Sequence, residues 1–145
     1  MNKIYVPTEK VLMGMKLPDL DKLYWSLFSR WIRLKAADIY TGYVSCFICG
    51  RRQHWTQMDC SHYIPRKHGS TRFSLLNNHA CCQWCNRGLA GNLKRYREKL
   101  NLAYGKTTSR KLEQMKNLTI KISRLDYVEG ILDVQKKLEL YERKT

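Results

Sequence analysis

The sequence predicts an α+β fold in which a small core of short strands, stabilised by a four-cysteine zinc site, is flanked by an N-terminal helix and by basic C-terminal helices. Three observations predict it. Two Cys-x-x-Cys pairs enclose a segment with strand character, an apolar stripe at helical spacing precedes them, and residues rich in Lys and Arg follow them with several helix start and stop signals. A chain of 145 residues with 43% hydrophobic content is expected to form one domain with a modest core.

The first 16 residues show no periodicity, and we expect residues 1–16 to be a flexible arm. Residues 17–145 are then expected to form a single domain. From Leu20 to Leu34 the apolar residues recur three and four positions apart, which predicts the N-terminal helix. The expected parts of the domain are a helix at 18–39, a core at 43–92 and a helical basic part at 93–145.

Within the core, residues 55–64 are predicted to form a strand, and short apolar runs at 73–76 and 79–81 are predicted to pair back on it. In the C-terminal part, Asn92 and then Thr107 or Thr108 are expected to cap two helices. Ser123 and Asp126 resemble a capping box, which predicts the start of the final helix.

The charge of the chain indicates a polyanionic partner. It carries 27 Lys and Arg against 12 Asp and Glu, a net charge of +15, and nucleic acid is the commonest partner of such a surface. A ribosome-associated or RNA-binding protein is the alternative. No run of 18 apolar residues occurs and the first residues lack the apolar core of a signal peptide, so we expect a cytoplasmic protein without membrane contact. The final helix could form a homodimer, or pack within the chain.

Four of the six cysteines are expected to bind one structural zinc ion. In a reducing compartment, paired cysteines at this spacing indicate metal ligands rather than disulfides. Four thiolates form a closed shell, so this ion would hold structure and perform no chemistry. Cys81 and Cys60 are interpreted as buried structural residues, because Cys81 lies at the wrong spacing from the last cysteine. The predicted ligands are Cys46, Cys49, Cys82 and Cys85.

A histidine between two cysteine pairs, with asparagines downstream, is similar to the arrangement in HNH-type nucleases, which implies a ββα-metal core holding one divalent ion against a phosphate. His62 can be the general base, since imidazole is partly neutral at pH 7. Asn77 lies where a loop asparagine would orient the strand of His62. Asp59 and Asn86 offer hard oxygen ligands of the kind that Mg²⁺ or Mn²⁺ prefers. Asp59 could instead be a partner of His62, and asparagines beside turns are also common caps.

Basic residues follow the candidate base and the second cysteine pair. We expect those after His62 to clamp phosphate and those after Cys85 to bind the DNA backbone, although a solvated basic surface is the alternative. The other histidines, His54, His68 and His79, are interpreted as surface residues or as partners of functional residues. The predicted DNA-binding residues are Arg66, Lys67, Arg72, Arg87, Lys94, Arg95 and Arg97.

These motifs together resemble the phage NinG family of recombination endonucleases, also called Rap. The resemblance rests on Asp59-x-x-His62-Tyr63, Thr71-Arg72-Phe73, Asn77 to Cys82, Cys82-x-x-Cys85-Asn86 and Gly91-Asn92. It implies an endonuclease that cuts branched DNA, such as D-loops and Holliday junctions, in a bacterial host and beside a phage or host recombinase. It also implies that His62 is the base, with Asn77 as the loop asparagine and Asn86 at the last metal position. The alternative is a non-catalytic zinc-ribbon protein that recognises branched DNA for a partner.

Overall fold

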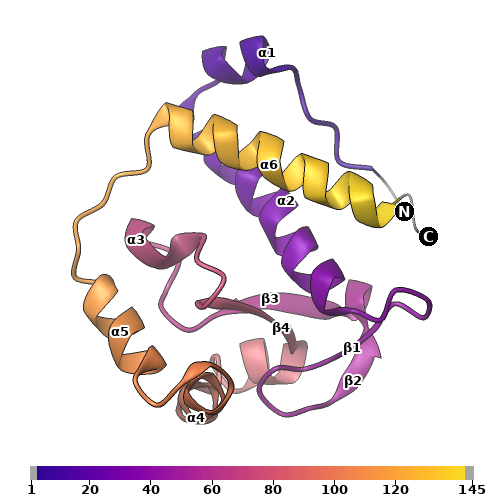
Figure 1. Ribbon diagram of the computed structural model, residues 1–145, viewed down its shortest axis with the longest axis vertical. Helices are drawn as coiled ribbons and strands as arrows, with labels where there is room; N and C mark the ends of the chain where they lie inside the picture. The colour runs from indigo at the N-terminus through magenta and orange to yellow at the C-terminus, as the bar shows by residue number, and fades with distance from the viewer. Residues whose placement is uncertain (1–2, 143–145) are drawn as a thin grey trace. The chain divides into compact units, whose positions relative to one another are not determined.

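The computed structural model describes residues 3–142, which divide into two compact units (Figure 1). One unit comprises the described residues of Met1–Trp31 and Ile122–Thr145, and the other comprises Ile32–Lys121. Helix α2 (Leu17–Ala36) contributes residues to both units. The single domain expected over 17–145 stays a prediction.

The first unit is helical. Helix α6 (Arg124–Glu142) begins at the predicted capping box, in which the Asp126 backbone N–H donates to Ser123 Oγ at 3.1 Å and the Ser123 backbone N–H donates to the Asp126 carboxylate at 2.8 Å. Its apolar face is buried and includes Val128 and Ile131. Close packing also requires Gly130, because a Cβ there would lie 2.4 Å from Cζ of Tyr24.

A short helix, α1 (Glu9–Gly14), forms within the segment expected to be a flexible arm. Leu12 is fully buried, and the guanidinium of Arg124 donates to the backbone oxygen of Met13 at 3.1 Å. One buried leucine gives no periodic pattern, which is why the sequence indicated no helix here.

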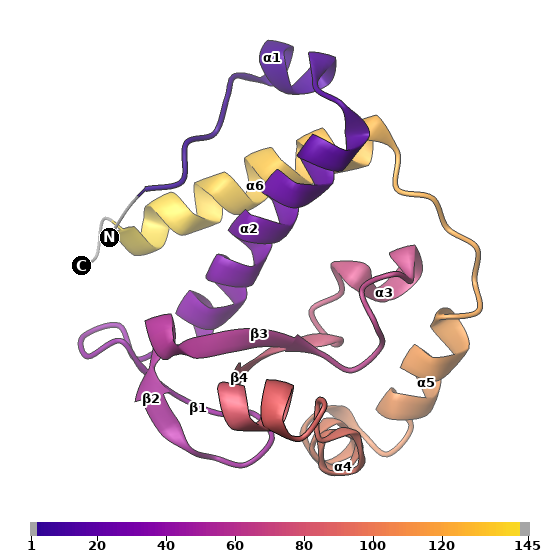
Figure 2. The same ribbon diagram turned by 180° about the vertical axis from the view of Figure 1, so that it is seen from behind.

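The second unit contains two separate antiparallel hairpins (Figure 2). β1 (Tyr43–Ser45) pairs with β2 (Arg52–His54), and β3 (Met58–His62) pairs with β4 (Asn78–Cys82). All five residues of β4 are buried, so the β3–β4 hairpin lies in the core of this unit.

The strand boundaries differ from those predicted. Residues Trp55–Gln57 form a 3-10 turn, so the strand expected over 55–64 is shortened to β3. The strand expected over 73–76 is wrong, because helix α3 (Gly69–Arg72) ends just before it and the chain turns until β4 begins. The three-residue strands β1 and β2 are too short to produce a sequence pattern, and they were not predicted.

Helical segments lie before and after this hairpin along the chain. The predicted helix over 18–39 ends at Ala36, because the Asp38 carboxylate accepts the Thr41 N–H at 2.8 Å and so closes a turn. After β4 come a single π-turn, η2 (Trp84–Gly88), then α4 (Leu93–Tyr104) and α5 (Thr108–Met115). No described helix is both long and apolar enough to cross a membrane.

Asn92 and Thr107 precede α4 and α5 as expected, but neither side chain makes a capping hydrogen bond. Asn92 has a left-handed backbone, with φ at +47°. Its side chain is used elsewhere, because Nδ2 donates to Cys85 Sγ at 3.6 Å.

Candidate functional site

The four cysteines predicted to bind zinc come together at one point. Cys46 follows β1, Cys82 ends β4 and Cys85 lies in η2. The four Sγ atoms all lie within 4.8 Å of one another, and the Sγ atoms of Cys49 and Cys82 are 3.7 Å apart. A tetrahedral site with Zn–S bonds of about 2.3 Å requires sulfurs about 3.8 Å apart. The cluster therefore fits a zinc ion.

The surroundings of the sulfurs differ. Burial raises the pKa of Cys82 and Cys85, whereas hydrogen-bond donors favour the thiolate at Cys46. The backbone N–H of Cys49 donates to Cys46 Sγ, and that of Cys85 donates to Cys82 Sγ, both at 3.5 Å. A hydrogen bond from the Cys81 thiol lowers the pKa of Cys46 to about 4. Donors of this kind stabilise the deprotonated sulfur that binds metal. Among the described residues, no second cluster of three His, Cys, Asp or Glu side chains is close enough to hold a metal.

His62 is the last residue of β3 and is partly buried. Burial, followed by the positive charges of Arg66 and Arg72, lowers the pKa of His62. A lowered pKa keeps the imidazole neutral at pH 7. The ring can therefore accept a proton, which is the property that a general base needs.

Asn77 fixes the segment that leaves the His62 strand. Its side chain is 0% exposed, and its Oδ1 accepts the Ile64 N–H at 2.7 Å. Its Nδ2 donates to the backbone oxygens of Ile64 at 3.0 Å and Thr71 at 3.2 Å. These three hydrogen bonds hold the turn after His62 against the start of β4.

Asp59 and Asn86 are in direct contact. The Nδ2 atom of Asn86 donates to Asp59 Oδ2 at 2.8 Å. Arg87 also binds this carboxylate through two bonds, from Nε at 2.8 Å and from Nη2 at 2.7 Å. The side chain of Arg87 is 66% exposed, so it can leave the carboxylate for solvent or for another anion.

The structure does not bring Asp59 against His62. They are three residues apart in a regular strand, so their Cα atoms are separated by about 10 Å and their side chains lie on opposite faces. The residue directly opposite His62 across the ladder is Asn78. A ligand that contacts both Asp59 and His62 must therefore extend along about 10 Å of β3 and reach both faces of the hairpin.

The predicted DNA-binding residues differ in their surroundings. All are exposed except Arg72, which donates to the backbone oxygen of Arg66 at 3.0 Å and so shapes the loop after His62. Arg97 contacts Glu113 at 2.9 Å and donates to the hydroxyl of Tyr63 at 3.0 Å. Arg87 and Arg97 therefore have carboxylate partners, and these partners lower the positive charge that they present.

His79, interpreted from the sequence as a surface or partner residue, is buried on β4. Its Nδ1 is 2.8 Å from the Tyr96 hydroxyl and its Nε2 is 3.0 Å from the Tyr104 hydroxyl, and its ring stacks on Phe47 with centroids 3.8 Å apart. Burial is the main cause that lowers the pKa of His79 to about 4. Alternation of apolar and polar residues along a strand can indicate which side chains are buried. Because β4 is buried on both faces, its sequence shows no such alternation.

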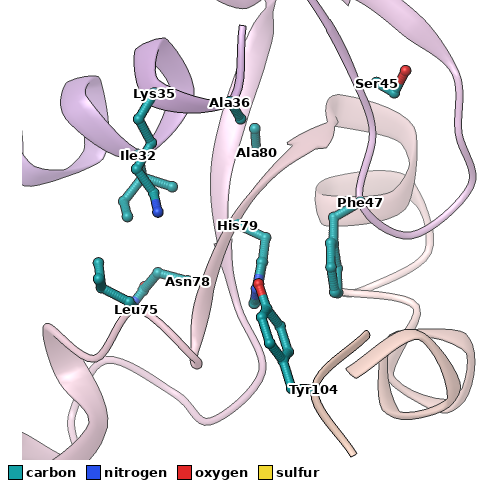
Figure 3. A pocket seen from close by; sticks show the side chains of 10 residues that line it. All are labelled: Ile32, Lys35, Ala36, Ser45, Phe47, Leu75, Asn78, His79, Ala80 and Tyr104. Atoms are coloured by element: carbon teal, nitrogen blue, oxygen red, sulfur yellow. The ribbon is translucent and has the colours of Figure 1, made fainter. Parts of the chain in front are cut away.

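Beside β4 lies a pocket of about 200 Å³ (Figure 3). It was not expected from the sequence, because its walls come from segments far apart in the chain. They include the end of α2, the turn after β1, β4 itself and the last residue of α4. His79, Asn78 and Tyr104 are among the lining residues.

The fold and the site define a small, basic α+β protein with a four-cysteine cluster that can hold zinc. The chain belongs to the family described as Bacteriophage Lambda NinG protein, whose model matches residues 13–144. This membership supports a bacteriophage origin and suggests a function related to phage recombination. The comparisons with curated proteins and with solved structures gave no match.

Proposed function

We propose that this protein is a metal-dependent endonuclease that hydrolyses phosphodiester bonds in branched DNA, such as D-loops and Holliday junctions. The observation that carries the proposal is His62, a histidine with a lowered pKa at the end of a core strand. The positive charges that act on it belong to Arg66, on the loop that follows, and to Arg72, the last residue of α3. A neutral base next to phosphate-binding groups is what hydrolysis of a phosphodiester requires.

In this proposal β3, β4 and η2 form an HNH-type ββα-metal core. The hairpin supplies Asp59 and His62, and η2 supplies Asn86 directly after the last cysteine. The zinc cluster connects the end of β4 to η2 through Cys82 and Cys85. The ion would therefore hold η2, which carries Asn86, beside the hairpin whose other strand, β3, carries Asp59.

The reaction would use the residues of the chain as follows. His62 takes a proton from the attacking water, and Arg66 and Arg72 bind the scissile phosphate. Asn77 keeps the turn after His62 in place through its bonds to Ile64. The expected products carry 5′-phosphate and 3′-hydroxyl ends.

The donor set of the second metal site fits Mg²⁺ or Mn²⁺, because a carboxylate and an amide oxygen are hard ligands. Asp59 and Asn86 would hold this ion, which when bound would supply positive charge for the developing charge on the leaving oxygen. Because Asp59 and His62 lie on opposite faces of β3, the ion and the base would have to approach the phosphate from different sides of the strand. Arg87 occupies the Asp59 carboxylate and would have to exchange with the ion. Its exposed guanidinium can then bind a DNA phosphate.

Basic residues of α4 would hold the DNA backbone without reading bases, which suits recognition by shape. Lys94 and Arg95 are exposed on this helix. We further propose a phage or host recombinase as a partner, and a homodimer on a junction, since a four-way junction is two-fold. Sedimentation that finds only monomer on and off a junction would remove the dimer.

The bidentate pair of Arg87 and Asp59 favours a second candidate, a zinc-containing DNA-binding protein without catalysis. In that protein the carboxylate is neutralised permanently and takes no metal. It would bind branched DNA and recruit an enzyme.

One experiment separates the two candidates. The substrates are a labelled four-way junction, a D-loop and a linear duplex, each incubated in Mg²⁺ or Mn²⁺. The proteins are the wild type, His62→Ala and His68→Ala. His68, on the loop that follows, serves as the matched histidine control. The endonuclease predicts branch-selective cutting by the wild type and by His68→Ala, and binding without cutting by His62→Ala. Tight junction binding by all three proteins with no cutting in either metal would support the binding protein instead.

A further inference from the structure

The turn η2 exposes a tryptophan to solvent. Trp84 lies between Cys82 and Cys85 of the zinc cluster and is 58% exposed, whereas the other three tryptophans of the chain are buried or partly buried. Leu89 and Leu93, which follow, are 43% and 51% exposed. Single exposed apolar residues are common, but three large ones within ten residues indicate a contact surface.

One face of the Trp84 indole is covered by its own turn. A Cβ built on Gly88 would lie 2.4 Å from Cε3 of Trp84, 2.8 Å from Cζ3 and 3.0 Å from Cδ2. That point is above the ring face, because a point at the ring edge would be distinctly farther from the two atoms bonded to Cε3. Gly88 therefore covers one face of the ring. The exposed area belongs to the opposite face and to the ring edge.

The same turn is tied at several points. Cys82 and Cys85 enclose Trp84, so a bound zinc ion would hold the chain on both sides of it. Asn86 Nδ2 donates to Asp59 Oδ2 at 2.8 Å and connects the turn to β3. An aromatic ring that is already fixed in position loses little conformational entropy when a ligand covers it.

The charged residues near Trp84 in the sequence are all basic. The segment Cys82–Arg97 contains no Asp or Glu. Arg87 lies on the same turn and its side chain is 66% exposed, and Lys94 and Arg95 are exposed in the first turn of α4. A flat apolar ring among cations suits a polyanion that carries flat rings. Single-stranded nucleic acid is bound in this way, by aromatic rings that stack on bases and cations that hold the backbone.

We propose that the open face of Trp84 stacks on one unpaired nucleobase of branched DNA, with Arg87 beside an adjoining phosphate. The bonds from Arg87 to Asp59 use Nε and Nη2, which leaves the donors of Nη1 for that phosphate. Lys94 and Arg95 would hold the backbone further along. The inference rests on the proposed binding of branched DNA, which both candidate functions share, and does not require cutting.

Stacking on Trp84 would select branches by shape. Bases inside a continuous duplex are covered on both faces by their neighbours, whereas branch points expose unstacked bases. Every base has a flat face, so we expect this contact to favour an unpaired base without a preference for its identity.

The test measures binding without Mg²⁺ and Mn²⁺ and with zinc retained, so that cutting does not contribute. The probes are labelled three-way junctions that carry adenine, thymine or an abasic site at a single unpaired position, and binding is followed by fluorescence anisotropy. The proteins are the wild type, Trp84→Phe, Trp84→Leu and Tyr40→Leu, each with its zinc content measured. Tyr40 is the matched control, because it is an aromatic residue that is 94% exposed on the turn after α2.

We expect the wild type and Tyr40→Leu to bind the adenine and thymine probes about 10-fold more tightly than the abasic probe. Trp84→Leu should bind all three probes with the affinity of the abasic one. Trp84→Phe keeps a smaller ring and should lie between them. Equal affinity of the wild type for the adenine and abasic probes would overturn the proposal. Wild-type discrimination by Trp84→Leu would also overturn it, and would assign the exposed ring to a protein partner instead.

A second measurement keeps the test decisive if Trp84→Leu loses its zinc. A base stacked on Trp84 should quench the tryptophan emission of the wild type, so the adenine probe should quench it more than the abasic probe does. Trp84→Phe should lose this difference. Equal quenching of the wild type by the two probes would overturn the proposal without any variant.

These results can be separated from the failure of the proposed function. No binding to any probe would remove the proposed function itself. Branch-selective cutting by a wild type that does not discriminate the probes would remove the stacking contact alone. Discrimination without cutting in either metal would leave the stacking contact standing and remove the nuclease.

Discussion

Replacing Asn77 tests whether a single buried amide holds the turn after His62. Asn77→Ala leaves the Ile64 N–H without its acceptor at 2.7 Å and removes the donor that Ile64 O accepts at 3.0 Å. Thr71 O keeps a second donor, the Ser74 N–H at 3.1 Å, and should add little. A buried unsatisfied N–H costs about 1 to 3 kcal/mol and a lost hydrogen bond about 1 kcal/mol. The free energy of unfolding should therefore fall by about 2 to 4 kcal/mol.

The assay is urea unfolding of the zinc-loaded protein. For a slope of about 2 kcal/mol per molar urea, the midpoint should fall by about 1 to 2 M. Asn101→Ala is the matched control. Asn101 is only partly buried and accepts one bond, from the Ser109 N–H at 2.9 Å, so water can replace it and the cost should stay near about 1 kcal/mol or below.

A third variant examines the charge at the same place. Asn77→Asp has nearly the same shape, but it places a carboxylate oxygen against the backbone oxygens of Ile64 and Thr71. It should be less stable than Asn77→Ala, because an unpaired buried charge costs more than a missing bond. Equal urea midpoints for Asn77→Ala and Asn101→Ala would refute this account of the turn.

Three further predictions concern the metal, the base and the helical unit. Cys82→Ser should lose the bound zinc and unfold the second unit, whereas Cys60→Ser should keep one zinc per chain by metal analysis, because structural zinc contributes about 10 kcal/mol or more. If His62 is the base, the cleavage rate should rise with pH up to the pKa of His62 and be constant above it. Because that pKa is lowered, the midpoint of the rise should lie below about 6.5. A midpoint above this value would contradict the assignment of His62 as the base. Gly130→Ala should lower the midpoint of thermal unfolding, because the added Cβ would lie 2.4 Å from Cζ of Tyr24. This clash should outweigh the preference of helices for alanine, which is worth about 1 kcal/mol. An unchanged or raised midpoint would show that the ring of Tyr24 moves aside.

The features that could be predicted from the sequence are those set by local spacing. Two Cys-x-x-Cys pairs fix which sulfurs can share an ion, and the cluster found contains the four predicted cysteines. The capping box of Ser123 and Asp126 is likewise a matter of three residues, and its bonds are present. Family membership was also predicted from short motifs at fixed distances, and the family match confirms it.

The features that could not be predicted depend on contacts between distant segments. Arg87 was expected to face DNA, but it pairs with Asp59, 28 positions earlier, through strand register and the position of η2. His79 gave no sign of burial, because its partners Tyr96 and Tyr104 lie on a helix that follows the zinc cluster. Asn78 and Asn77 look alike in sequence, and only the hairpin register separates their roles.

The length of β4 has a consequence for how this sequence can evolve. Its first residue, Asn78, lies opposite His62, and its last, Cys82, belongs to the metal cluster, so four steps of strand separate them by about 14 Å. One inserted or deleted residue would turn every following side chain to the other face and carry the sulfur away from its ion. Natural variants should therefore change side chains inside 78–82 but not the number of residues there. Insertions should occur instead at 65–76, in the turns on either side of α3.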